Sequence, residues 1–201
     1  MGFSFFFRDV ETMDLLIEHA IPELRSNRYI NIWSAGCSEG QEPYTFAIKL
    51  RENLGHFAFR RIKIFATDID NTTGKFGERI TKGVYPKEMV ERVEKKILST
   101  YFKPIDNGLN YQIVPEIKNV IEFKKHDLLS YKEIRRDFNI ILCKNVLMHF
   151  RESQRTEVIK MFHRALEPNG YLAMEKTQSM PNGASNLFER VTEKGQIYKK
   201  K

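Results

Sequence analysis

Cysteine and histidine are scarce in this chain. Its 201 residues include two cysteines, Cys37 and Cys143, which stand far apart and form neither a disulfide framework nor a metal-ligand spacing. The five histidines never stand three or four positions from one another, so the sequence does not favour a metal site. The simplest interpretation is a protein of the reducing cytoplasm that binds no metal.

Long apolar runs, repeats and low-complexity segments are also missing. The longest apolar runs are only a handful of residues, too short to cross a membrane, so we expect no membrane insertion. The N-terminus begins apolar but becomes charged at Arg8 and Asp9, unlike a signal peptide. No linker divides the chain, and we expect a single domain over residues 1–201.

Acidic residues are fewer than basic ones. Hydrophobic residues make up 41% and charged residues 29%, the balance of a globular protein with a buried core. The formal charge of +7 favours acidic partners. Because the basic residues occur mostly as pairs or triplets beside acidic or apolar neighbours, ordinary solvated faces explain them better than a nucleic-acid stripe. We therefore expect no nucleic acid among the partners.

Helix-like and strand-like patterns alternate along the chain. The helical patterns cover residues 11–24, 43–54, 70–80, 87–98 and 155–166. The strand-like patterns cover residues 30–34, 62–67, 110–114, 119–123, 138–143, 171–174, 188–191 and 196–199. Strands separated by helices predict an α/β fold with a mostly parallel sheet and helices on both faces. We expect residues 110–114 and 119–123 to pair as an antiparallel hairpin, and the last two strands to add an antiparallel edge.

The segments that follow the strands are where chemistry is expected, because ligands of such sheets bind outside the carboxyl ends of the strands. After the first strand, Gly36 and Gly40 form a Gly-x-x-x-Gly pattern, which differs from the GxGxxG of dinucleotide-binding enzymes. The loop fits an ordinary strand-to-helix turn and a backbone that approaches a ligand equally well. Glu42 either stabilises the start of the next helix or meets the ammonium group of a bound amino acid.

Acidic residues follow two further strands. Asp68 can accept two hydrogen bonds from a ribose diol, and we prefer that role to a merely solvated side chain. We expect Asp70 to cap the next helix. Asp127 can receive an adenine amino group, while Leu128 and Leu129 are placed to contact the two faces of the ring.

Seven segments, in this order, resemble the CheR family of chemoreceptor methyltransferases. They are Ser4-Phe5-Phe6-Phe7-Arg8-Asp9, IWSAGCSEGQEPYTFAIKL, FATDID, KGVYP, HDLL, FNIILCKNVLMHF and LEPNGYLAMEK. The resemblance implies a Rossmann-like class I S-adenosylmethionine-dependent methyltransferase with a small antiparallel β-subdomain at about residues 101–123. It also implies S-adenosylmethionine as methyl donor and S-adenosylhomocysteine as product. The implied acceptor is a glutamate side chain of an acidic, helical, chemoreceptor-like protein.

The resemblance also assigns roles to single residues. The implied cofactor-binding residues are Ser4, Arg8, Gly36, Glu42, Asp68, Asp127, Leu128, Lys144 and Asn145. Within this set, Glu42 and Asp68 match the acids that hold the methionine ammonium and the ribose. Arg8 and His149 are the predicted catalytic residues, expected to orient the acceptor carboxylate. Since that carboxylate is already ionised at neutral pH, positioning and exclusion of water are expected to carry the transfer without a general base.

The chain departs from the family pattern at several of these positions. Asp127 stands where Asn is usual, Lys144 where Arg is usual, and His149 where Tyr is usual. Family members also carry an N-terminal helical domain, whereas this sequence begins at the FFR motif. Two alternatives therefore stay open: a methyltransferase for a small molecule or another protein, and a cofactor-binding module with reduced catalysis. The sequence does not specify the oligomeric state.

Overall fold

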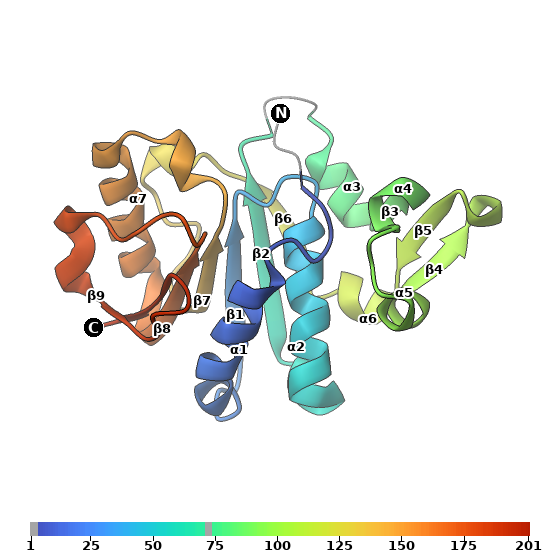
Figure 1. Ribbon diagram of the computed structural model, residues 1–201, viewed down its shortest axis with the longest axis horizontal. Coiled ribbons are helices and arrows are strands. Elements are labelled where there is room, and N and C mark those ends of the chain that lie inside the picture. The colour runs from blue at the N-terminus through green and yellow to red at the C-terminus, as the bar shows by residue number, and fades with distance from the viewer. Residues whose placement is uncertain (1–3, 71–73) are drawn as a thin grey trace.

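Parallel strands form the centre of the molecule (Figure 1). The computed structural model describes residues 4–70 and 74–201. The strands of its large sheet are β1 Ile30–Ala35, β2 Ile62–Asp68, β6 Ile121–Lys125, β7 Phe138–Cys143, β8 Leu166–Met174, β9 Phe188–Arg190 and β10 Ile197–Lys200. Over the described residues their order is β6-β2-β1-β7-β8-β10-β9. Only β10 runs in the direction opposite to the other strands of this described sheet, so the predicted, mostly parallel α/β architecture is confirmed.

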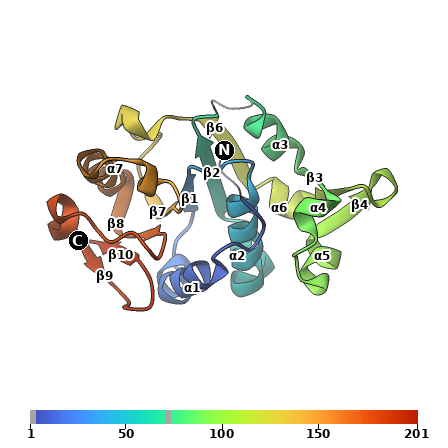
Figure 2. The same cartoon turned by 45° about the horizontal axis from the view of Figure 1, so that its top comes forward.

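Helices cover both faces of this sheet (Figure 2). Helix α1 spans Val10–Leu24, helix α2 spans Gln41–Phe59, and both bury residues in one core. Helix α7, Glu152–Ala165, packs into a second core. The apolar stripe predicted for α1 is confirmed, since Leu16 and Ile17 are buried. Burial of an aliphatic side chain of this size stabilises the fold by roughly 1.5–3 kcal/mol.

Burial from two sides explains the apolar composition of the central strands. All of β7 is buried, and so is β1 except at the half-buried Asn31, as expected for parallel strands between helical layers. Neighbouring β1 residues face opposite cores, Ile32 that of α1 and α2, and Trp33 that of α7. The Trp33 indole donates to Thr67 Oγ1 over 2.8 Å, so the polar atom of this large buried side chain is satisfied.

A small antiparallel sheet lies at one end of the molecule (Figure 1). Its strands are β3 Val84–Pro86, β4 Phe102–Ile105 and β5 Asn110–Ile113, in the order β3-β5-β4. The predicted hairpin between residues 110–114 and 119–123 is wrong. The strand β5 pairs with β3 and β4, whereas β6 pairs in parallel with β2 of the large sheet. Between them Pro115 starts a short helix, for which its fixed φ is suited.

The remaining helices are short. They are α3 Phe76–Lys82, α4 Lys87–Val90, α5 Lys95–Tyr101 and α6 Pro115–Lys118, with 3₁₀ turns η1 Asp106–Gly108, η2 Leu128–Ser130, η3 Leu147–His149 and η4 Asn182–Leu187. The helix predicted over residues 70–80 begins only at Phe76, because the backbone is left-handed at both Asp70 (φ 46°) and Gly74 (φ 64°). Residues 71–73 of that prediction lie outside the described residues. The helix predicted over residues 87–98 is two helices, because Glu94 is extended (ψ 137°).

Two further helix boundaries differ from the prediction. The helix α2 begins before Pro43 and continues past residue 54 through a non-helical Gly55. The helix α7 begins before residue 155, because the backbone N–H of Arg151 donates to Gln154 Oε1 over 3.0 Å and so closes the first turn. Among residues 4–70 and 74–201, no helix combines the length and apolarity needed to cross a bilayer.

Candidate functional site

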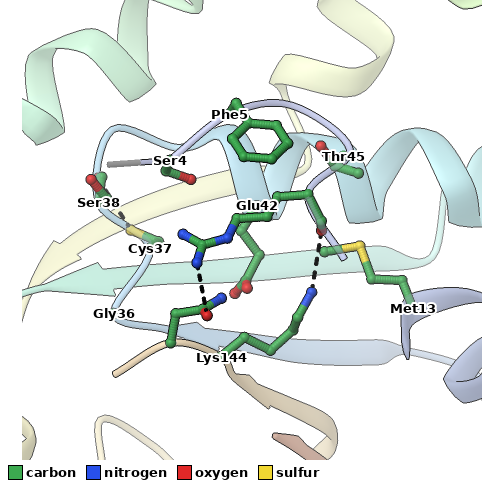
Figure 3. A pocket seen from close by; sticks show the side chains of 11 residues that line it. Ser4, Phe5, Met13, Gly36, Cys37, Ser38, Glu42, Thr45 and Lys144 are labelled. Carbon is green, nitrogen blue, oxygen red and sulfur yellow. Dashed lines mark hydrogen bonds between the residues drawn. The ribbon is translucent and has the colours of Figure 1, made fainter. Parts of the chain in front are cut away.

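A cleft lies at the ends of β1 and β7, bordered by the starts of α1 and α2 and by the N-terminal segment (Figure 3). Its lining residues are Ser4, Phe5, Arg8, Met13, Gly36, Cys37, Ser38, Glu42, Thr45, Lys144 and Asn145. The cavity measures about 80 Å³. Pockets for drug-sized ligands usually exceed roughly 300 Å³. A ligand of that size would therefore extend along the neighbouring strand ends or displace part of the N-terminal segment.

In the turn after β1, the backbone at Gly36 lies at the cleft without a side chain. The N–H groups of Gly36 and Cys37 both donate to the Thr67 carbonyl, at 2.8 and 2.9 Å, which fixes the turn against β2. Gly36 has φ +81°, and a Cβ atom there would lie 2.2 Å from Cγ2 of Val146. Both the left-handed backbone and the lack of space require glycine at this position.

Glu42 brings a carboxylate into the cleft from the first turn of α2. Its Oε1 accepts a hydrogen bond from Ser34 Oγ at 2.9 Å. Burial raises the pKa of this carboxyl, while the positive charge of Lys144 and the Ser34 hydrogen bond act in the opposite direction. An enclosed carboxylate with these neighbours is suited to receive a cationic group of a ligand.

Asp68 ends β2 and organises the adjoining loop. Its Oδ2 accepts from the Ser38 N–H at 2.8 Å, and its Oδ1 accepts from the Asp70 N–H at 3.1 Å. A carboxylate has about four acceptor positions, so two further hydrogen bonds from a diol can still be accepted. The N-cap residue of α3 is Lys75 and not the predicted Asp70, but Asp70 Oδ2 still accepts from the N–H of Phe76, the first residue of that helix, at 3.2 Å.

Residues 4–9, here called the N-terminal strap, pass over the cleft (Figure 3). Arg8 Nη2 donates to Asn145 Oδ1 at 3.0 Å. The ammonium group of Lys144 donates to the carbonyls of Arg8 and Asp9, at 3.3 and 3.1 Å. On the other side of the strap, the Phe7 N–H donates to Thr45 Oγ1 at 3.0 Å. The strap is therefore held both by the segment that follows β7 and by α2.

The small sheet is connected to the cleft through the turn that follows β1. The Tyr85 hydroxyl of β3 donates to the Glu39 carbonyl at 2.7 Å, and Arg79 forms a 2.7 Å ion pair with the Glu39 side chain. Phe6 of the strap packs edge-on against Tyr85 and Phe102, with ring centres 4.9 and 5.2 Å apart. Sequence reasoning missed these contacts, because they join residues far apart in the chain.

Six predicted site residues line the cleft together: Ser4, Arg8, Gly36, Glu42, Lys144 and Asn145. Asp68 adjoins them through Ser38. Asp127 and Leu128 lie after β6, farther along the strand ends, where Asp127 Oδ1 accepts from the Leu129 N–H at 2.8 Å. His149 is exposed on η3 and is not among the lining residues. The roles assigned to all of these residues stay predictions.

Five lining residues were missed from the sequence: Phe5, Met13, Cys37, Ser38 and Thr45. Thr45 stands three positions after Glu42 on α2, and that spacing places both on one helix face, so the helical pattern contained a signal for it. Cys37 and Ser38 belong to the glycine-flanked turn itself. Among the described residues, no group of three or more His, Cys, Asp or Glu side chains is arranged to hold a metal ion.

The chain is similar to curated chemotaxis protein methyltransferases. A chemotaxis protein methyltransferase of Listeria innocua is 33% identical over 184 residues, which are 90% of this chain and 66% of that protein. One of Borreliella burgdorferi is 30% identical over 192 residues, 92% of this chain and 66% of that protein. The chain thus spans about two thirds of the length of these curated relatives.

The fold comparison agrees with the sequence relatives. The crystal structure of the DszA carbon methyltransferase aligns with a TM-score of 0.50 at 17% identity, over 89% of this chain and 37% of that one. The predicted class I methyltransferase fold is therefore confirmed. The family described as "CheR methyltransferase, SAM binding domain" matches residues 3–197, and this chain belongs to that family.

Proposed function

We propose that this chain binds S-adenosylmethionine in the cleft and transfers its methyl group to glutamate side chains of an acidic, helical, chemoreceptor-like protein. The proposal includes a single domain acting in the cytoplasm, in chemotaxis-type signalling. The observation that carries it is a pair of acids, Glu42 in the cleft at the start of α2 and Asp68 at its border at the end of β2. Membership of the CheR family supports the same reading.

The residues present fit the proposed donor. Glu42 would hold the methionine ammonium, because its enclosed carboxylate is suited to a cation. Gly36 would let the backbone of the turn after β1 lie beside the ligand, because its left-handed conformation and the Val146 side chain packed against it exclude any larger residue. Asp68 would accept the ribose hydroxyls with its remaining lone pairs. Leu128, which is 6% exposed, would contact the adenine ring.

The chain's own residues need only position and shield the reactants. When bound, S-adenosylmethionine supplies a methyl group on a positively charged sulfur, and an acceptor carboxylate that displaces this sulfur yields a methyl ester and S-adenosylhomocysteine without releasing a proton. Arg8 borders the cleft, and its contact with Asn145 holds the guanidinium where it can orient that carboxylate. The orienting contact must be loose, because tight pairing would stabilise the reactant as well as the transition state.

Titration calorimetry with S-adenosylhomocysteine tests the binding half of the proposal. Asp68→Ala should weaken binding at least about tenfold, since hydrogen bonds to a charged group contribute roughly 1.5–3 kcal/mol. Asp106→Ala is the matched control, because the Asp106 carboxylate also accepts a hydrogen bond, from Asn110 Nδ2 at 2.8 Å, but lies in η1 beside the small sheet. Thermal unfolding checks that both proteins are folded. If the wild-type protein and Asp68→Ala then bind S-adenosylhomocysteine with equal affinity, Asp68 does not hold the ribose.

A further inference from the structure

Glu175 is a buried acid beside the cleft that the proposed mechanism does not use. It directly follows β8, whose last residue, Met174, is paired with Cys143 at the end of β7. The residue is 4% exposed. Its Oε2 accepts from the Asn145 N–H at 3.1 Å, whereas its Oε1 is buried and has no hydrogen-bond partner within the described part of the chain. Burying a carboxylate with one unsatisfied oxygen costs free energy unless a nearby positive charge compensates it.

The bond to Asn145 holds an uncommon backbone conformation. Asn145 has φ +60°, a left-handed conformation that is rare outside glycine but tolerated best by Asn and Asp. In that conformation its side chain turns to the strap, with Oδ1 accepting from Arg8 and Nδ2 donating to Asp9 Oδ2 at 3.4 Å. Glu175 therefore acts on the residue that contacts the predicted catalytic arginine.

The negative charge of Glu175 compensates the positive charge of Lys144. Lys144 is only 4% exposed, and its ammonium group donates hydrogen bonds to two neutral backbone carbonyls of the strap. Its compensating charges are Glu42 and Glu175, because it acts electrostatically on both carboxyls. Once a ligand ammonium neutralises Glu42, Glu175 is the acid left to balance Lys144.

We propose that Glu175 is a positioning residue: it fixes Asn145 and balances Lys144, so that these two residues close the N-terminal strap over the bound donor. This role rests on the function proposed above. It acts through the strap and involves no contact of Glu175 with donor or acceptor.

Hydrogen exchange and transfer kinetics of Glu175→Gln test this role. Glutamine keeps one oxygen as acceptor for the Asn145 N–H, while the second oxygen becomes an NH₂ group and the negative charge is removed. In the ligand-free protein, exchange of the strap amides should accelerate at least about fivefold, because the strap opens more often. In the transfer assay with receptor fragments, kcat should fall about tenfold, while KM for the acceptor changes less and the unfolding temperature stays within a few degrees.

The matched control is Glu167→Gln. Glu167 is an acid within β8 whose pKa is raised by burial, as is that of Glu175, and its carboxylate accepts hydrogen bonds from the side chains of Asn27 and Asn139. It lies away from the cleft lining, so its substitution should change neither strap exchange nor kcat. A similar effect of both substitutions would show that only general stability is being measured, and would overturn the proposal.

A double-mutant cycle with Lys144→Met decides whether Glu175 acts through Lys144. If it does, adding Glu175→Gln to Lys144→Met lowers kcat no further, whereas independent effects would multiply and contradict the proposal. Unchanged strap exchange in Glu175→Gln would overturn it as well. If the wild-type protein transfers no methyl group, the proposed function fails, and the exchange comparison still decides the role of Glu175.

Discussion

Two glycines have nearly the same backbone conformation, but one lies in the cleft and the other in an ordinary turn, so substituting each distinguishes an effect on ligand binding from an effect of backbone strain. Gly36 (φ +81°) and Gly108 (φ +84°) are both left-handed, but only Gly36 has an atom within 4 Å of where a Cβ would be. Gly36→Ala should weaken S-adenosylhomocysteine binding at least about tenfold and destabilise the protein by about 1–3 kcal/mol, from strain plus the clash with Val146.

Gly108→Ala is the control for backbone strain. It should destabilise the protein by about 1 kcal/mol and leave ligand affinity unchanged. Calorimetry and denaturant unfolding measure both quantities for each variant. Equal affinity losses in the two variants would mean that the turn after β1 has no special relation to the ligand.

Arg8 is the residue on which the proposed transfer depends most. Arg8→Ala should lower methyl transfer by about a hundredfold or more, because the acceptor carboxylate loses its orienting contact. The free energy of unfolding should change little, since Arg8 is only half-buried. Unchanged turnover of the purified variant would remove Arg8 from the mechanism.

Some residues could be placed from sequence because their role is local. Asp70 was expected to cap the next helix; the N-cap residue is Lys75, but the Asp70 carboxylate does accept from the first N–H of that helix, which begins later than predicted. Glu175 could not be placed, because its position beside Asn145 depends on the pairing of β7 with β8. Nothing near either residue in the sequence indicates that contact.

At the scale of elements, the small sheet is coupled to the turn after β1. Tyr85 of β3 is fully buried and donates to the Glu39 carbonyl in that turn. Tyr85→Phe leaves this carbonyl without its partner, which should cost about 1–3 kcal/mol of stability. Because the turn loses an anchor, S-adenosylhomocysteine affinity should also fall, by about threefold or more.

Tyr101→Phe is the matched control at this scale. Tyr101 of α5 is 4% exposed, and its hydroxyl donates to Glu52 rather than to the turn. It should destabilise the protein and leave the affinity measured by calorimetry unchanged. An affinity loss confined to Tyr101→Phe would contradict the coupling.

Elements of the large sheet could be predicted because burial on both faces leaves a continuous apolar run, as in β7. The strand with which a short alternating strand pairs could not be predicted. β5 and β6 both fit a hairpin pattern, and only the tertiary structure assigns them to different sheets. Helix starts were misjudged where a local backbone choice decided them, such as the extended Glu94 before α5.

At the scale of the whole molecule, the cleft acids make stability depend on pH. Burial raises the pKa of Glu42, so the folded protein holds that proton more tightly than the unfolded chain. The stabilisation is present below the ordinary carboxyl value of 4.5 and is lost as pH rises through the raised folded value. In the ligand-free protein, the stability of Glu42→Gln relative to wild type should therefore increase as the pH rises from about 4 to about 7. Denaturant unfolding of both proteins at these two pH values measures the difference.

Glu78 supplies a control of opposite sign. Its hydrogen bond with Lys82 lowers its pKa, so its contribution is present above the unfolded value and is lost as pH falls. Glu78→Gln should lose stability relative to wild type over the same rise in pH. A Glu42→Gln difference that stays constant with pH would contradict the enclosed-carboxylate account of the cleft.

Ester formation is the most direct test of the central claim, that the cleft presents a methyl group to a glutamate carboxylate. The protein is incubated with S-adenosylmethionine carrying a labelled methyl group and with chemoreceptor cytoplasmic fragments, and the products are treated with base, which hydrolyses methyl esters to methanol. The account predicts volatile label from fragments with glutamate at the modified positions and none when glutamine replaces it. Label that resists base, or label confined to small molecules, would contradict it.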